Sequence, residues 1–448
     1  MTDQLETPSV MDARVDLPVP RALVVIAITV LGAVAVFMAA TIASIYGDGS
    51  FYLLTLIRDG SSFDVPGREL LVGLRDLPVL VALKLGETNT HTLGFVQSVS
   101  YILLPAGVWA LSIVLAARDR VTFALVALAC AFCFGIMIFF SVSELVLGIA
   151  LVAFVSTLLA QTRPWTITAS VTASAAMVIL VAAHESIALC AFVVFAHAVV
   201  RVMRSQVRID RIGGFAVAAL AVASVAWSIW TWVNFPNDNS HSFMEFLLNL
   251  QPRSSALLLV LTVIVAVFAL TPWVDRQRMF AVVLLLPVVT LAAVCVISAG
   301  RASPHLAYDS RGYAVLAIVG LQLSLLVMWL RRRRSGKPRR NPPTAWQVAV
   351  PVGFLVLMLA IPTSYTLHWR VARDQFRHVV VTKSGLQVAP AVLPPDALFY
   401  SWSWADPSLS VVLRQSPGNA IVYWPGFPVV PFEPATGGQQ LPPEFSWR

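Results

Sequence analysis

The segment YGDGSFY, residues 46–52, directly follows the first long apolar run of the chain, which extends from residue 22 to residue 45. Glycine on either side of Asp48 allows the backbone to turn sharply and a ligand to approach closely. Tyr46 and Tyr52 have an ordinary explanation, because tyrosine is enriched at the headgroup level of a membrane. Anchoring does not explain a charged aspartate, so we predict that Asp48 faces a reaction centre at the membrane surface.

The rest of the chain is dominated by apolar residues. Of its 448 residues, 58% are hydrophobic and 12% are charged, well below the charged fraction of about 25% in soluble domains. This composition predicts an all-α polytopic membrane protein. The net charge of +8 does not indicate nucleic-acid binding, because most of the positive charge lies in short loops between apolar runs, where the positive-inside rule predicts it.

A bilayer crossing needs about 20 apolar residues, and on this criterion the sequence predicts about eleven transmembrane helices. They lie near residues 22–45, 93–117, 121–140, 145–160, 167–183, 187–203, 213–233, 255–273, 279–299, 314–330 and 345–362. A cytoplasmic N-terminus puts 18 of the 31 lysines and arginines on the cytoplasmic side, including the run Arg331–Arg334. We therefore expect a multi-pass protein of the cell membrane with an extracytoplasmic C-terminus.

Three regions follow from this topology: a disordered cytoplasmic tail (1–21), a transmembrane domain (22–362) and an extracytoplasmic C-terminal segment (363–448). In the first outer loop, residues 47–92, Leu70, Leu74 and Leu77 share one face of a predicted helix over residues 68–77. Such amphipathic helices lie in the interface plane of a membrane. In the C-terminal segment, residues 409–413 and 420–424 flank a Pro-Gly turn and predict a β-hairpin.

The candidate catalytic residues are acids on the predicted outer side, in short loops with almost no basic residue nearby. A charge at membrane depth costs about 3 kcal/mol unless it meets water, a partner or a ligand. The acids at issue are Asp48, Glu144, Glu185, Asp238, Glu245 and Asp309. We predict catalytic roles for Asp48, for Glu144 and for the adjacent pair His184 and Glu185. For Glu144 alone, a solvated residue at a helix end is an equal alternative.

A second group of polar residues predicts substrate binding. Arg301 and Arg311 could hold a phosphate, because the planar guanidinium matches phosphate oxygens in a fork. The alternative is a loop paired within itself, Asp309 with Arg311. The predicted substrate-binding residues are Arg301, His305, Tyr308, Asp309, Arg311 and Tyr52. Aromatic residues of the C-terminal segment could stack on sugar rings or dock the segment on the membrane rim: Tyr400, Trp402, Trp404, Tyr423, Trp424 and Trp447.

This layout resembles the GT-C superfamily of integral membrane glycosyltransferases over residues 22–320. The shared features are an outer acid directly after the first transmembrane helix, amphipathic surface helices, further acids in short outer loops and a trailing outer segment. The resemblance implies hexosyl or pentosyl transfer, of the inverting type, from a polyprenyl-phosphate-linked sugar to a cell-envelope glycan or lipid acceptor. It also implies that Asp48 is the first-loop acid, which serves as catalytic base or as a metal or acceptor contact.

The chain departs from the family in its first loop, where Asp59 and Asp64 are the only candidates for the second acid of the usual pair. Two alternatives are therefore open: either a divalent cation binds at the site, or arginines alone neutralise the phosphate leaving group. The main alternative function is a flippase or transporter of a lipid-linked or small polar substrate. That function expects ionisable residues near the bilayer midplane and broken helices, whereas polar residues within the helices here are few, such as His197 and Gln322. A scaffold for envelope assembly is the third alternative.

Overall fold

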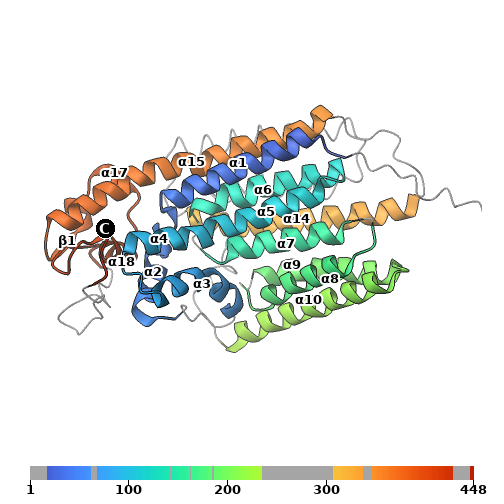
Figure 1. The fold of residues 1–448 in the computed structure, drawn as a ribbon, viewed down its shortest axis with the longest axis horizontal. Coiled ribbons are helices and arrows are strands. Elements are labelled where there is room, and N and C mark those ends of the chain that lie inside the picture. Colours follow the sequence, from blue (N-terminus) through green and yellow to red (C-terminus); the bar gives the residue numbers. More distant parts are fainter. Residues whose placement is uncertain are drawn as a thin grey trace, which may run out of the picture.

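The computed structural model describes residues 18–61, 68–140, 143–161, 163–183, 186–234, 306–335, 345–426 and 444–447. These segments form an almost entirely helical structure (Figure 1). Its helices and strands are α1 (Arg21–Ala40), η2 (Ala43–Ile45), α2 (Asp48–Asp59), α3 (Glu69–Lys84), α4 (Thr90–Ser98), η3 (Val99–Leu103), α5 (Leu104–Ala116), α6 (Arg120–Phe140), α7 (Leu145–Leu159), α8 (Ile167–Val181), α9 (Ile187–Arg204), α10 (Arg208–Asn234), α14 (Leu306–Ser335), α15 (Ala345–Thr382), β1 (Leu386–Val388), α16 (Ala389–Val392), α17 (Pro395–Phe399), α18 (Asp406–Leu413) and β2 (Ile421–Tyr423).

Among the described residues, six helices are long and apolar enough to cross a membrane: α1, the continuous helix α4–η3–α5, α6, α9, α10 and α15. The prediction of an all-α protein with membrane-spanning helices agrees with this finding, but the number eleven is not confirmed. α7 and α8 have 15 residues each and are therefore only about 22 Å long, shorter than the hydrocarbon core of about 30 Å. The spans predicted near residues 255–273 and 279–299 lie outside the described residues.

The core of the bundle is formed by α6 and α7. Every residue of α7 is buried, as expected for a helix that is apolar on all sides. α6 packs along α15 and α14, and α15 also packs along α1. α8, α9 and α10 form a group of three helices beside α7 (Figure 1).

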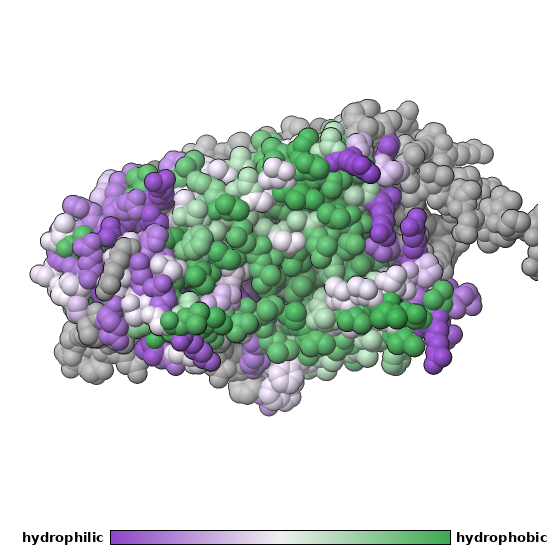
Figure 2. Space-filling view, in the orientation of Figure 1, coloured by the Kyte–Doolittle hydropathy of each residue, from purple (hydrophilic) through white to green (hydrophobic). Residues whose placement is uncertain are grey.

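The surface of the bundle is apolar around its middle. Figure 2 shows a broad hydrophobic band with hydrophilic residues at both ends. Large apolar side chains are exposed along the long helices, among them Val25, Val36, Leu111, Val171, Phe192, Phe215 and Val356. A contiguous apolar surface of this size marks a protein whose sides meet lipid rather than water.

The two ends of the bundle differ. α2, α3 and the elements after Thr382 lie together at one end, defined here as the capped end (Figure 1). α1 begins, and α14 ends, at the opposite end. The Asp48 turn and the arginine run after residue 330 are thus separated by the length of the bundle. The extracytoplasmic location of the capped end stays a prediction from the distribution of arginine and lysine.

The helix predicted over residues 68–77 is present as α3, which continues through Pro78 to Lys84. Leu70, Leu74 and Leu77 are exposed, as expected for a helix in contact with the interface. An amphipathic helix in the interface plane is expected to expose its charged face to water, but Arg75 and Asp76 are buried inside the protein. The buried side of α3 thus combines this charged pair with the apolar Leu71, Val72 and Val79.

The predicted β-hairpin is wrong. Residues 409–413 belong to α18, and β2 pairs in parallel with β1, with Leu386 opposite Ile421. An apolar run in which every residue is buried has no periodicity that separates strand from helix. The deciding signal was Asp406-Pro407, because an acidic residue and proline in the first turn favour a helix start.

Candidate functional site

The turn between α1 and α2 is built on unusual backbone angles. α1 ends at Ala40, and Ile42 then adopts a φ of 57°, which β-branched residues rarely do. Gly47 has a φ of 51° and directly precedes α2. A Cβ atom on Gly47 would lie 3.5 Å from the Trp402 ring, an ordinary contact, so glycine is needed here for its backbone angle.

Asp48 is the first residue of α2 and is partly exposed. A carboxylate in the first turn of a helix is stabilised by the helix dipole. Behind it, the buried Tyr46 hydroxyl accepts a hydrogen bond of 2.7 Å from Trp402 Nε1. Burial, and to a smaller extent Asp48, raises the pKa of Tyr46 far above its ordinary value. Tyr46 is therefore a neutral, buried phenol behind the Asp48 carboxylate.

Two aromatic residues follow Asp48 on α2, and a third ring packs against one of them. Phe51 and Tyr52 follow it at the spacing i+3 and i+4, which puts all three on one side of α2. The Phe51 ring centroid lies 6.0 Å from that of Tyr52 and 5.6 Å from that of Trp404. All four side chains are partly exposed. This α2 face, defined by Asp48, Phe51, Tyr52 and Trp404, combines a proton acceptor with apolar rings that suit the faces of a sugar.

Tyr52 connects the α2 face to α3. The Arg75 guanidinium lies 4.8 Å from the Tyr52 ring centroid and 4.4 Å from that of Tyr101, which is within cation–π distance. Arg75 also pairs with its neighbour Asp76, Nε to Oδ1 at 2.9 Å. Tyr101 donates a hydrogen bond to the same Asp76 oxygen at 3.2 Å.

Glu144 joins this buried group from the start of α7. Its Oε1 lies 2.7 Å from Arg68 Nη1, and its Oε2 lies 3.3 Å from Arg75 Nη1. The buried network consists of Arg68, Arg75, Asp76, Tyr101 and Glu144. The premise that Glu144 has no basic residue nearby is wrong, because these arginines lie 76 and 69 positions earlier in the chain. Both carboxylate oxygens are engaged in holding α3 against α7.

Of the predicted site residues, the structure links Asp48, Tyr52 and Glu144 through α2 and Arg75. His184, Glu185, Arg301 and His305 lie outside the described residues, as do Asp238 and Glu245. Tyr308, Asp309 and Arg311 belong to α14, but their side chains are not among those described.

Two other polar residues named in the sequence analysis lie away from the α2 face. His197 is buried edge-on to Trp329, with ring centroids 5.9 Å apart, and within the described residues its Nε2 makes no hydrogen bond. Asp59 pairs with Arg58 at 2.6 Å on the surface. In the part of the chain that the structure describes, no group of three or more His, Cys, Asp or Glu side chains is arranged to hold a metal ion.

Sequence reasoning missed Asp406, which is buried at the start of α18. Its carboxylate accepts hydrogen bonds from the Trp402 backbone N–H at 2.8 Å and from Trp424 Nε1 at 2.9 Å, and it also bonds the Ser401 hydroxyl. Burial raises the pKa of Asp406 to about 7. Because Trp402 also bonds Tyr46, Asp406 ties the C-terminal segment to the Asp48 turn. The Asp-Pro pair after a Trp-rich stretch was the available signal.

Comparison with protein families, with curated proteins and with solved structures found no match. The fold and the site therefore define the class: an all-helical protein with membrane-spanning helices, one end of which carries a half-buried carboxylate among aromatic rings.

Proposed function

We propose that this protein is an integral membrane glycosyltransferase of the GT-C type. It transfers a hexosyl or pentosyl group from a polyprenyl-phosphate-linked donor to a cell-envelope glycan or lipid acceptor on the extracytoplasmic face. The observation that carries the proposal is the α2 face, where partly exposed Asp48 begins the helix after the first apolar helix and lies beside Phe51 and Tyr52.

The chemistry assigns Asp48 as the general base. A carboxylate within about 3 Å of the acceptor hydroxyl can take its proton as the oxygen attacks the anomeric carbon. The bond from that carbon to the phosphate oxygen breaks, and polyprenyl phosphate leaves with the electron pair. Arg301 and Arg311, which sequence analysis assigned to phosphate binding, neutralise the leaving group with or without a divalent cation.

The surroundings of the α2 face support sugar binding. Phe51 and Trp404, with ring centroids 5.6 Å apart, present apolar surfaces that suit the C–H face of a pyranose or furanose ring. Tyr52 adds a ring with a polar hydroxyl. Pockets with aromatic walls and a few polar groups are the usual form of small-molecule sites.

The neighbouring α3 supports access of a lipid donor. Its exposed leucines, Leu70, Leu74 and Leu77, face outward, while Arg75 on its inner side contacts Tyr52. A donor whose hydrocarbon chain stays in the bilayer would pass α3 to bring its sugar to the α2 face. The buried pairs of Arg75 and Glu144 keep α3 in this position.

The back of the site is held rigidly. Trp402 packs on Gly47 and bonds Tyr46, and Ser50 Oγ donates to the Gly47 carbonyl at 3.0 Å. When the groups that support a catalytic base are fixed, the base is held in its productive orientation, which favours proton transfer.

The decisive experiment compares Asp48→Asn with Asp59→Asn, an exposed aspartate at the other end of the same helix. Membranes with equal amounts of each variant receive radiolabelled polyprenyl-phosphate mannose, glucose or arabinose, and lipid and glycan products are counted. We expect Asp48→Asn to lower transfer by about 10²–10⁴-fold, with unchanged abundance, and Asp59→Asn to behave as wild type. Full transfer by Asp48→Asn would overturn the assignment. Movement of the labelled donor across proteoliposomes without any transfer would favour a transporter instead.

A further inference from the structure

The C-terminal part of α15 carries three arginines on one side. Arg370, Arg373 and Arg377 follow one another at i, i+3 and i+7, so they form a stripe along the helix. The stripe lies at the level of the Asp48 turn, because the ring of Trp369 packs edge-on against Tyr46 at a centroid distance of 5.2 Å. Arg370 is exposed, Arg377 is half-buried and Arg373 is buried.

Arg373 has a structural task within this stripe. Its Nη1 donates to the Thr41 carbonyl at 2.7 Å, just after the end of α1, where a cation is favourable. Its Nη2 lies 2.8 Å from Asp374, whose side chain is 57% exposed. A pair with so exposed a carboxylate offsets little of the positive charge.

An imidazole faces the same place from another helix. His91, in the first turn of α4, lies edge-on to Trp447 with ring centroids 4.6 Å apart. Arg373 lies 5.7 Å from the same Trp447 ring, and both Arg373 and Arg377 act electrostatically on the His91 imidazole. Arg373 and His91 thus both contact Trp447, and Arg377 lies near enough to His91 to act on it.

Arg377 is the arginine of this cluster that has a hydrogen-bond donor available for a ligand. Within the described ranges, no acidic side chain pairs with it, and its Nε is shielded from solvent without a hydrogen-bond partner. A shielded donor that makes no hydrogen bond is unfavourable. An anion with several acceptor oxygens would satisfy it and would relieve the repulsion among the three arginines.

We propose that Arg377 and Arg370, supported by Arg373 and His91, bind the phosphate group of a lipid headgroup. The guanidinium fork matches phosphate oxygens. Leu367 and Val371, one turn before Arg370 and directly after it, are exposed on α15 and offer an apolar track for the lipid chain. The site does not use Asp48 and is independent of the proposed sugar transfer.

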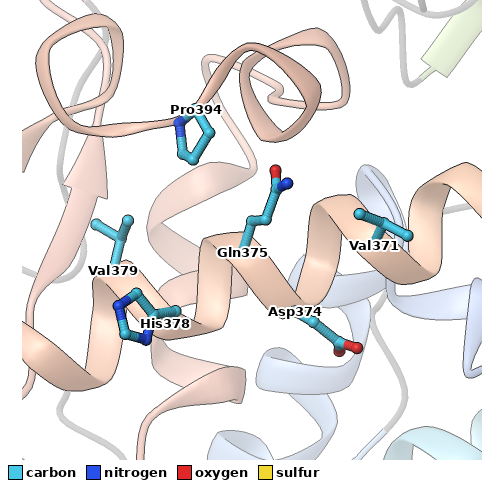
Figure 3. A pocket seen from close by; sticks show the side chains of 6 residues that line it. All are labelled: Val371, Asp374, Gln375, His378, Val379 and Pro394. Atoms are coloured by element: carbon cyan, nitrogen blue, oxygen red, sulfur yellow. The ribbon is translucent and has the colours of Figure 1, made fainter.

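The groove on the neighbouring side of α15 does not serve this purpose. Figure 3 shows Gln375 pointing toward Pro394 and Asp374 pointing away from it. None of the three arginines lines this groove, and an aspartate does, which disfavours an anion there. Its lining residues are Val371, Asp374, Gln375, His378, Val379 and Pro394.

The test measures binding of dioctanoyl phosphatidic acid to the detergent-purified full-length protein by native mass spectrometry. Dioctanoylglycerol, which lacks the phosphate, and inorganic phosphate are the two comparison probes. The variants are Arg377→Gln and Arg370→Gln. Arg58→Gln is the matched control, because it removes a surface arginine of the capped end that pairs with Asp59.

We expect phosphatidic acid to bind the wild type, and Arg377→Gln to weaken that binding by about tenfold or more, the loss of one charge-assisted hydrogen bond. Arg58→Gln should change it less than about twofold. Inorganic phosphate that competes in an Arg377-dependent way would assign the site to the phosphate group itself; no competition would assign it to the intact headgroup. Should Arg377→Gln lower the melting temperature without lipid, the exposed Arg370→Gln takes its place. Equal binding by wild type and both variants overturns the proposal.

Discussion

Glu144 offers the sharpest test of the buried network beneath the α2 face. Glu144→Gln keeps the shape of the side chain but removes the charge that pairs with Arg68 and Arg75. The side chains of Glu144 and Arg68 are only 3% and 7% exposed, and their atoms lie 2.7 Å apart. Water therefore cannot replace the lost partner.

The magnitude follows from this burial. Removing one partner of a buried ion pair costs about 3–5 kcal/mol. Arg75 retains Asp76 at 2.9 Å, so most of the loss falls on Arg68 and the lower half of that range applies. In a chain of 448 residues, we expect the melting temperature to fall by about 3–4 °C.

The assay is thermal melting in detergent, read as the fraction of protein that still elutes as a single species on size exclusion. Asp59→Asn is the control, because its exposed pair with Arg58 is worth about 1 kcal/mol at most. Arg68→Met combined with Glu144→Gln should recover part of the stability, since no buried charge is then left without its counter-charge. A Glu144→Gln variant that melts like wild type but transfers no sugar would refute the reasoning and would make Glu144 a participant in the chemistry.

Two further predictions concern Gly47 in the turn before α2 and Asp406 at the start of α18. Gly47→Ala should destabilise the protein by about 1–3 kcal/mol, because alanine disfavours a φ of 51°. Gly32→Ala, within α1, is the control and should not destabilise the protein, because no atom lies within 4 Å of the new Cβ. Equal melting temperatures of the two variants would contradict the geometry of the turn. Asp406 has a pKa raised from 3.8 to about 7, so the folded protein keeps a proton between these pH values that the unfolded chain releases. Its contribution makes stability fall as pH rises from about 4 to 7, by about 4 kcal/mol at most, and level out above. Melting from pH 5 to 8 should show this slope in the wild type and lose it in Asp406→Asn; a slope that persists in the variant has another source.

The helices were predictable where local pattern decides them. The apolar runs near residues 22–45 and 121–140 correspond to α1 and α6, because a span needs only length and apolarity. α3 was also predictable, since three leucines at helical spacing define its outer side. Gly47, directly before Asp48, was correctly predicted to lie in a turn, because this role depends only on its own backbone conformation.

What escaped prediction depends on distant partners. The arginines that pair with Glu144 are about 70 positions away, and no periodicity relates them to α7. β1 and β2 are separated by α16, α17 and α18, so their parallel pairing could not be read from either strand. The burial of Asp406 could not be predicted either, because it arises only when Trp402 and Trp424 close around the carboxylate.

The hydrogen bond between Tyr46 and Trp402 joins residues 356 positions apart. During synthesis the chain grows from its N-terminus. The turn after α1 therefore cannot form its hydrogen bond with Trp402 until most of the polypeptide has been made. The proposed base, Asp48, is thus synthesised long before Trp402, which supports it from behind. An incomplete chain in the membrane would therefore lack a fully formed site.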